Sequence, residues 1–310
     1  MSSSAEKKLG SRTPVNKVTL PPYYPNHPDI LRDWAAYLDS VRMTDVMVGE
    51  VMARLEKEGI REKTLIIFMT DHGISHARGK QFLYDEGTHV PLVISGPGIE
   101  AGRTRTDVVE HVDISAISLA AAGIRIPEHM QARNILANDY SPRRPVFSAR
   151  DRCDETVDHI RSVRTESFKY IRNFLPERPY LQPCRYKDAK SILIALRDWN
   201  AKDKLNSTQK LIFRETRPTE ELYDLTRDPH EIKNLAVVPE YADKLKEMRR
   251  RLNRWMRRTN DQGQIPETAE MYDSDMEDYL QKNRNNPDST QLRILEKNIA
   301  QMKQWASGGK

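Results

Sequence analysis

The amino-acid sequence predicts an α/β fold with a mostly parallel β-sheet, followed by a smaller antiparallel unit. Apolar runs typical of buried strands, at residues 65–70 and 90–95, alternate with segments of helical periodicity. Such alternation is typical of a parallel sheet covered by helices. After about residue 156 the pattern changes, and two strand-like segments follow each other with only a short turn between them. We therefore expect a core of strands and helices that precedes an antiparallel hairpin.

A long helix is the first predicted element, running from Asp29 to about Glu58. Prolines at positions 21, 22, 25 and 28 keep the preceding backbone extended, and Asp29 can cap the first turn. Apolar residues recur at helical spacing along this segment, and Gly59 ends it. The apolar stripe comprises Leu31, Trp34, Leu38, Val41, Val48, Met52 and Leu55.

Two strands joined by a loop form the next predicted unit. The strands are Leu65–Thr70 and Val90–Ser95, and a Gly-Pro-Gly turn closes the second. A short apolar helix over residues 112–122 and a strand over Pro145–Ala149 follow. Leu65–Thr70 is apolar almost throughout, which is typical of a central strand buried on both faces.

The segment after about residue 156 is predicted to be antiparallel. Ser162–Thr165 and Phe168–Arg172 form a hairpin. A helix over residues 187–200, a short strand at Glu221–Leu225 and a strongly basic helix at Pro239–Arg258 follow.

The two ends of the chain are polar. Residues 1–20 are predicted to be disordered or extended, and residues 266–310 to be a polar tail. The start has no apolar core and is not a signal peptide. No apolar run approaches the roughly 20 residues that a membrane helix needs, so we expect no membrane segment.

The overall charge is a weak guide to partners. The formal net charge of +5 mildly favours polyanions, but 50 basic residues are nearly matched by 45 acidic ones. We expect no nucleic-acid partner. Cys153 and Cys184 are the only cysteines, and we expect both to be free thiols.

The richest stretch for chemistry is the loop after the first strand. Asp71 and His72 offer a hard oxygen and a borderline nitrogen to a divalent cation, and Gly73 lets both side chains face one point. Lys80 follows as a compact positive charge that suits an oxyanion held by that cation. The Asp-His-Gly tripeptide alone would also fit a simple turn at a strand end.

Four motifs in this stretch resemble the type I sulfatases of the alkaline-phosphatase-like superfamily. They are TDHG, RGK, YDEG and THVPL, in this order. The resemblance covers most of residues 20–260. Within the family, RSVRTESFKYIRNF, YKDAK and RPTEELYDLTRDPHE are most similar to the heparan N-sulfatase branch, which hydrolyses N-sulfoglucosamine. The resemblance implies part of an alkaline-phosphatase-like core over residues 21–156 and a small antiparallel C-terminal subdomain over residues 157–265.

The resemblance also implies roles for three residues of the loop. Asp71 and His72 would be ligands of a calcium ion, and Lys80 would bind the sulfate oxygens and stabilise the leaving group. His89 follows the YDEG motif, a position from which it could face the substrate or assist proton transfer, or simply bond to the backbone.

A second set of candidates follows the strand at Pro145–Ala149. Arg150, Asp151 and Glu155 fall at a strand end, where substrate pockets form in α/β folds. Their guanidinium and carboxylate groups suit the hydroxyls and carboxylates of a glycan. We expect a substrate-binding role for all three.

One motif of the family is missing. Type I sulfatases use a formylglycine made from Cys or Ser in a Cys/Ser-x-Pro/Ala-x-Arg motif, and a paired-aspartate strand before it supplies more metal ligands. Cys153 and Cys184 are followed two positions later by Glu155 and Tyr186, so neither fits. We expect this chain to be the C-terminal part of a sulfatase acting on sulfated glycosaminoglycan, inactive without the missing N-terminal half.

Two other functions remain open. A phosphatase or phosphodiesterase of the same superfamily would also use a metal ion and a lysine. A non-catalytic pseudo-enzyme could hold a polyanion with its pocket or its basic helix. The family is usually extracytoplasmic, and without a signal peptide the sequence leaves the compartment open.

Overall fold

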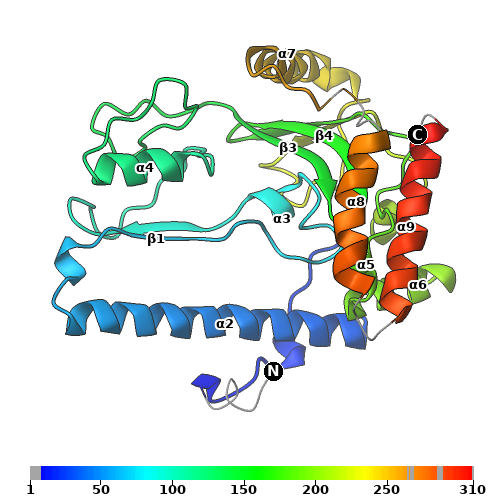
Figure 1. Cartoon of the computed structure of the whole chain (residues 1–310), viewed down its shortest axis with the longest axis horizontal. Helices are drawn as coiled ribbons and strands as arrows, with labels where there is room; N and C mark the ends of the chain where they lie inside the picture. Colours follow the sequence, from blue (N-terminus) through cyan, green and yellow to red (C-terminus); the bar gives the residue numbers. More distant parts are fainter. Residues whose placement is uncertain (1–7, 264, 266–268, 285–288, 309–310) are drawn as a thin grey trace.

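The computed structural model describes residues 8–263, 265, 269–284 and 289–308. In this part of the chain the strands form one two-stranded and one four-stranded sheet. Figure 1 shows α2 (Pro28–Lys57) along one side of the molecule and α7 (Ala242–Arg258) on the opposite side, with the strands between them. The predicted α/β class is confirmed.

The long helix α2 spans almost the predicted residues, but a different residue caps it. Pro28 occupies the first turn, so the N-cap position falls on His27. The Nδ1 atom of His27 accepts the backbone N–H of Asp29 at 3.0 Å. Asp29 itself lies in the first turn, where its negative charge favours the helix dipole.

The first two strands run antiparallel, where the sequence predicts a mostly parallel sheet. β1 (Ile66–Met69) pairs with β2 (Leu92–Ser95), with Ile66 opposite Ser95 and Met69 opposite Leu92. The prediction is wrong for this pair because the connection contains only the single helical turn α3 (Asp85–Thr88). A parallel return needs a long crossover, usually an α-helix.

The second sheet confirms the predicted antiparallel part. Its strand order is β3-β4-β5-β6, and every neighbouring pair is antiparallel. The strands are β3 (Val146–Cys153), β4 (Thr156–Arg164), β5 (Phe168–Asn173) and β6 (Glu220–Asp224). The predicted domain boundary near residue 156 falls in the turn between β3 and β4, where Asp154 has a positive φ of 52°.

Helix α7 packs against this second sheet. Met248, Leu252 and Met256 of α7 pack against Val163, Tyr170 and Leu222 of the strands, as the apolar side of the predicted basic helix requires. The other helices are α4 (Asp113–Ala121), α5 (Arg185–Asp188) and α6 (Ser191–Ala201). The 3-10 turns are η1 (Val15–Lys17), η2 (Arg61–Lys63), η3 (Gln209–Phe213) and η4 (Pro239–Tyr241).

The C-terminal residues form two helices in place of a polar tail. These are α8 (Ala269–Arg284) and α9 (Ser289–Ser307), which stand side by side (Figure 1). Leu295, Ile299 and Met302 recur three or four residues apart on α9, and they pack with Met276 of α8 and Val157 of β4. The segment is polar on average, so the prediction of a polar tail missed this short apolar stripe, which charged residues interrupt.

A buried ion network ties the antiparallel sheet to the segment before β6. Asp158 accepts two hydrogen bonds from the guanidinium of Arg217, at 2.7 and 2.8 Å, and both side chains are 1% exposed. Arg150 lies 3.3 Å from the same carboxylate. Burial would raise the pKa of Asp158, but the charges of Arg217 and Arg150 hold it below its usual value.

Replacing Arg217 by methionine should destabilise the fold by about 3–5 kcal/mol, because it leaves a buried carboxylate with half of its partners gone. Urea unfolding followed by circular dichroism measures the change in free energy.

The matched control is Arg125→Met. Arg125 pairs with Glu128 at 2.6 Å, but its side chain is 84% exposed. We expect a change of no more than about 0.5 kcal/mol there. Equal effects of the two substitutions would show that the network contributes nothing beyond a surface pair.

Candidate active site

The loop of residues 71–89 folds back on itself at its glycines. The N–H of Gly73 donates to the carbonyl of Gly87 at 3.0 Å, and the N–H of Lys80 donates to that of Ile74 at 2.8 Å. A Cβ atom on Gly73 would lie 1.8 Å from a backbone oxygen of the same loop, and one on Gly79 would lie 1.9 Å from the oxygen of Ile74. Only glycine fits at these two positions, so the shape of the loop requires the glycines of the Asp-His-Gly and Gly-Lys motifs.

Arg78 anchors this loop to the C-terminal part of the chain. Its guanidinium donates to the backbone carbonyls of His230 and Glu231. It also lies 3.8 Å from the ring centroid of Tyr84 and 4.7 Å from that of Tyr23. The side chain is buried, so these contacts form in a low dielectric, where cation–π interactions are strongest.

Asp85 gives the loop a second anchor, on the antiparallel sheet. Its carboxylate accepts from Arg164 Nε at 3.0 Å and lies 2.5 Å from the ammonium of Lys169. Burial would raise the pKa of Asp85, but Lys169 and Arg164 hold it well below its usual range. Asp85 is therefore a structural carboxylate.

Asp71 and His72 lie together at the start of the loop. His72 Nδ1 is 2.7 Å from the carbonyl of Gly73, which can only accept, so Nδ1 carries the proton in the neutral ring. The lone pair of Nε2 then remains available, 3.6 Å from a carboxylate oxygen of Asp71. The Asp71 side chain is 86% exposed. These two atoms could bind one cation.

Calcium is a partial match to this pair. It takes six to eight oxygen ligands, whereas Asp71 and His72 supply one carboxylate and one imidazole. The pair therefore fits a share of a calcium site and not a whole one.

Lys80 comes from the same loop as this pair and presents an ammonium without a polar partner among the described residues. In the part of the chain that the structure describes, Lys80 Nζ makes no hydrogen bond or ion pair, and it lies 5.2 Å from the ring centroid of Tyr186. The backbone N–H of Lys80 donates a hydrogen bond to the carbonyl of Ile74, which lies two residues after His72. His89, at the other end of the loop, is 70% exposed, with Nδ1 3.6 Å from Asp85.

The candidates that follow the predicted end of β3 lie in different environments. They are Arg150, Asp151 and Glu155. Arg150 is buried and donates to the carbonyl of Gln81 at 2.6 Å, so it reaches the loop next to Lys80. Asp151 is half-exposed and pairs with Arg161 at 2.7 Å. Glu155 is buried and accepts the N–H of Arg185 at 2.7 Å. The side chains of Arg150 and Glu155 therefore both form hydrogen bonds to the protein's own backbone.

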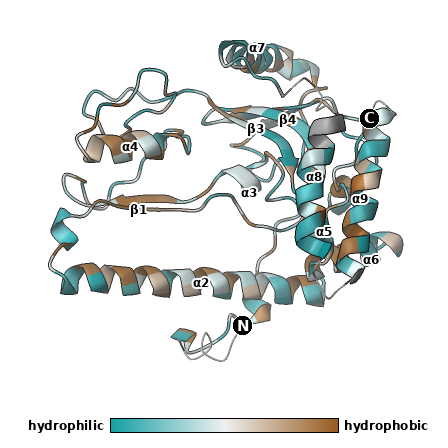
Figure 2. Ribbon diagram, in the orientation of Figure 1, coloured by the Kyte–Doolittle hydropathy of each residue, from teal (hydrophilic) through white to brown (hydrophobic). Residues whose placement is uncertain are grey.

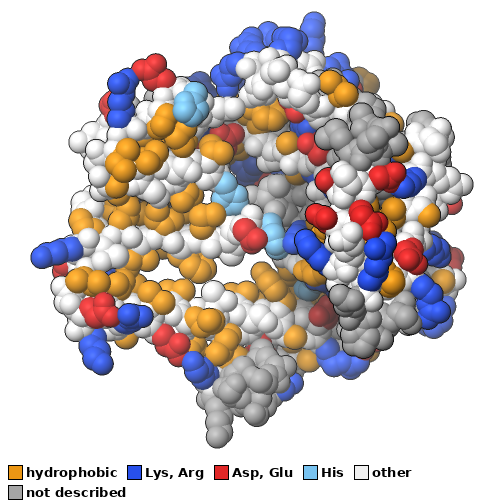
Figure 3. Space-filling view, viewed as in Figure 1, with side chains coloured by type: hydrophobic (Ala, Val, Ile, Leu, Met, Phe, Trp, Pro, Cys, Tyr) orange, Lys and Arg blue, Asp and Glu red, His pale blue; other side chains and the backbone are white. Residues whose placement is uncertain are grey.

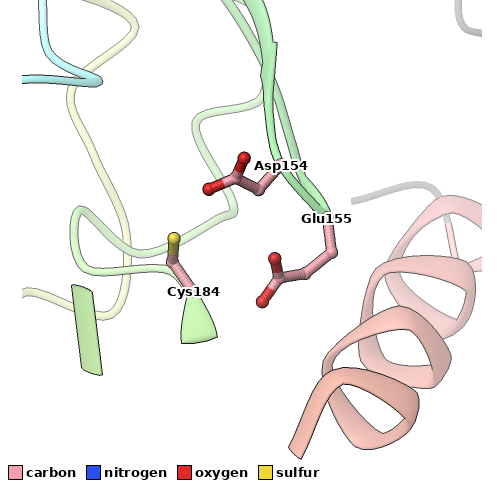
Figure 4. Close-up of side chains that lie close together, drawn as sticks. All are labelled: Asp154, Glu155 and Cys184. Carbon is pink, nitrogen blue, oxygen red and sulfur yellow. The ribbon is translucent and has the colours of Figure 1, made fainter. Parts of the chain in front are cut away.

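A second group of possible metal ligands lies in the turn between β3 and β4. Asp154, Glu155 and Cys184 place their ligand atoms within 4.8 Å of one another (Figure 4). Burial and the nearby Glu155 raise the pKa of the Cys184 thiol, which favours the protonated form that does not bind metal. Three donors are also one fewer than a structural zinc site uses.

Ser75, Tyr186 and Lys190 meet beside Lys80, and the sequence analysis assigns none of them to the site. Ser75 Oγ lies 2.9 Å from the hydroxyl of Tyr186, 111 positions further along the chain. Lys190 donates to the carbonyl of Ser75 at 2.7 Å. Only the YKDAK motif, which contains both Tyr186 and Lys190, offered a signal for them.

The chain matches two sulfatase profiles. Residues 6–124 match the sulfatase family, and residues 72–181 match "N-sulphoglucosamine sulphohydrolase, C-terminal". The chain belongs to the sulfatase family. Both matches include residues 72–89, the segment that carries Lys80.

Individual relatives agree with this family. The chain is 37% identical over 254 residues to the ulvan-active sulfatase of Formosa agariphila, covering 81% of this chain and 43% of the relative. It is 29% identical over 258 residues to human N-sulphoglucosamine sulphohydrolase, covering 79% and 51%. This sulfatase-family chain thus spans about half the length of these relatives.

A solved structure supports the alkaline-phosphatase-like fold. The protein yidJ of Bacteroides fragilis superposes with a TM-score of 0.61 at 18% identity, covering 85% of this chain and 52% of the other. Among the described residues, every helix is too short or too polar to cross a lipid bilayer.

His76, in the loop of residues 71–89, is buried among aromatic rings, which we call its aromatic cage. Its ring lies 5.0 Å from that of Trp34 and 5.7 Å from that of Tyr37, between centroids. Burial, with the charges of Lys190 and Lys187, lowers the pKa of His76 to about 4.

The cage of His76 should make stability depend on pH. The unfolded chain takes up a proton near pH 6.5 and the folded chain only near pH 4, so stability is lost as the pH falls through this window. The loss attributable to His76 is roughly 3 kcal/mol. His76→Phe should remove that share of the pH dependence in urea unfolding, while the exposed His129→Phe should keep the wild-type curve. Identical curves for all three proteins would contradict the neutral, caged histidine.

Proposed function

We propose that this chain forms part of a sulfatase that hydrolyses sulfate esters or sulfamates of a sulfated glycosaminoglycan. The observation that carries the proposal is the free ammonium of Lys80 in the loop that also presents Asp71 and His72. The relatives support a sulfated glycan as the substrate, because one is an ulvan-active sulfatase. The similarity to N-sulphoglucosamine sulphohydrolase supports the glycosaminoglycan class.

Lys80 is the residue that binds the sulfate to be cleaved. Negative charge grows on the sulfate oxygens as the bond to the leaving group breaks, and a fixed ammonium stabilises that charge. The tight backbone of the loop holds Lys80 in place before the substrate arrives, so little reorganisation is needed during the reaction. His89, which is exposed at the end of the same loop, would transfer the proton to the leaving group.

Asp71 and His72 would hold a calcium ion together with ligands from outside this sequence. When bound, calcium would supply positive charge to the sulfate oxygens. Asp71 would give a carboxylate oxygen and His72 its unprotonated Nε2 atom.

Asp151 is the exposed acceptor for substrate hydroxyls among the residues after β3. Arg150 would hold the loop beside Lys80 through Gln81, and Glu155 would fix the backbone at Arg185. Through these hydrogen bonds, Arg150 and Glu155 would hold the backbone around the substrate pocket without contacting the substrate.

The nucleophile would come from polypeptide outside these 310 residues. No cysteine or serine of the sequence begins a Cys/Ser-x-Pro/Ala-x-Arg motif, so the family's hydrated aldehyde has no precursor here. The surface supports a partner of this kind: Figure 3 shows hydrophobic side chains gathered over α4, β1 and α2. Figure 2 shows the same apolar character along β1, a strand of a sheet with two strands in the described residues. Exposed apolar residues of these parts of the chain include Met47 and Val51 on α2, Val93 on β2 and Ile124 after α4. A contiguous apolar surface of this kind is typical of an interaction site.

Substrate binding by Lys80 can be measured on the chain as it is. Lys80→Ala should weaken the binding of N-sulfoglucosamine about tenfold or more in isothermal titration calorimetry, because a charge-assisted contact to sulfate is lost. Lys202→Ala, which removes an exposed lysine paired with Asp198, should leave the affinity unchanged. Without a nucleophile, the wild-type chain should release no sulfate from this sugar in the presence of calcium.

Each other result points to a different function. Equal affinity in the two variants would reject Lys80 as the sulfate ligand. Sulfate release above that of Lys80→Ala would show that the chain holds its own nucleophile. Preference for a phosphate ester over the sulfated sugar would favour the phosphatase or phosphodiesterase alternative. Binding of polyanions without regard to Lys80 would favour the non-catalytic pseudo-enzyme.

A further inference from the structure

Three polar side chains converge on one point next to Lys80. Ser75 comes from the candidate loop, Tyr186 from α5, and Lys190 from the residue before α6. Ser75 Oγ and the hydroxyl of Tyr186 are 2.9 Å apart, and Lys190 Nζ lies 3.0 Å from the first and 3.4 Å from the second. We call Ser75, Tyr186 and Lys190 the hydroxyl triad.

One hydroxyl hydrogen of the hydroxyl triad is left without a hydrogen-bond acceptor within the triad. The three N–H groups of Lys190 point to the carbonyl of Ser75, its Oγ atom and the hydroxyl of Tyr186. One of the two O–H groups donates to the other oxygen. The remaining O–H finds no acceptor among the described residues, so it can donate to a bound molecule.

The charge around Tyr186 is positive. Lys190 Nζ lies 4.6 Å and Lys80 Nζ 5.2 Å from the centroid of its ring, within the range of a cation–π contact. In the described part of the chain, neither ammonium forms an ion pair with a carboxylate. Tyr186 is also 45% exposed, so a ligand in solution can reach it.

The ring and the hydroxyl of Tyr186 have separable effects. The ring faces Lys80 and limits where its ammonium can lie, which makes Tyr186 a positioning residue for Lys80. The hydroxyl belongs to the triad. The hydrogen bond with Ser75 and the charges of Lys190 and Lys80 lower the pKa of this phenol, which makes it a stronger donor to an anion.

We propose that the hydroxyl triad is a second anion-binding subsite, which takes a further sulfate or carboxylate of the glycan while Lys80 holds the sulfate to be cleaved. This inference rests on the proposed function, because it uses Lys80 as the first sulfate ligand. It selects substrates with two acidic groups close together over substrates with one.

The test compares two sugars in isothermal titration calorimetry with the full 310-residue chain. N-sulfoglucosamine carries one sulfate, and N-sulfoglucosamine 6-sulfate carries two. We expect the wild-type chain to bind the disulfated sugar about tenfold more tightly, which is the effect of one hydrogen bond to a charged group. Tyr186→Phe keeps the ring beneath Lys80 and should remove this preference, while the affinity for the monosulfated sugar stays within about twofold. Lys190→Met should also abolish the preference.

Tyr140→Phe is the matched control, because Tyr140 contacts Asp107 in a separate part of the chain. It should behave as the wild type, and circular dichroism should show the same fold in all variants. Equal binding of the two sugars by the wild type would overturn the subsite. So would a Tyr186→Phe variant that keeps the preference or weakens both sugars equally. Failure of the proposed function has a different signature, since Lys80→Ala would then leave both affinities unchanged.

Discussion

The contact of Arg78 with the C-terminal part of the chain is the interaction on which the candidate site depends. One buried guanidinium satisfies two backbone carbonyls at residues 230 and 231 and rests on the rings of Tyr84 and Tyr23. The loop of residues 71–89 has almost no regular secondary structure of its own. Its shape is therefore fixed from outside, by Arg78 at one point and by Asp85 on the sheet at another. The ammonium of Lys169 contacts both the carboxylate of Asp85 and the carbonyl of Leu83.

Among the described residues, positively charged side chains are paired in the scaffold and unpaired at Lys80. Arg150, Arg161 and Arg217 are buried, and each is bonded to a carboxylate or a carbonyl. A buried charge without partners is costly, so these pairings are a condition of folding. Lys80, which is only partly buried, has no hydrogen bond or ion pair at its ammonium in the described part of the chain. We propose that an anion is the partner of this charge.

Local patterns predicted the elements whose structure is decided locally. Helical spacing predicted α2 and α7, and the short turn at Glu166-Ser167 predicted the β4–β5 hairpin. The direction of β2 relative to β1 could not be predicted, because it depends on the path of the whole connecting loop. For the site, the glycines predicted a tight loop around Asp71 and Lys80. Tyr186 escaped assignment because it reaches the loop from 111 positions away, by a path that no local spacing encodes.

We infer that Arg78 holds the loop of residues 71–89 rigid, and amide hydrogen exchange tests this most directly. The amides of Gly73 and Lys80 are bonded inside the loop, so in the wild type they should exchange slowly, like amides of the β3–β6 sheet. Arg78→Lys keeps the charge but loses the two-pronged contact. It should accelerate exchange at Gly73 and Lys80 about tenfold or more, and leave the sheet amides unchanged. Fast exchange of these loop amides in the wild type, or equal protection in Arg78→Lys, would contradict the account.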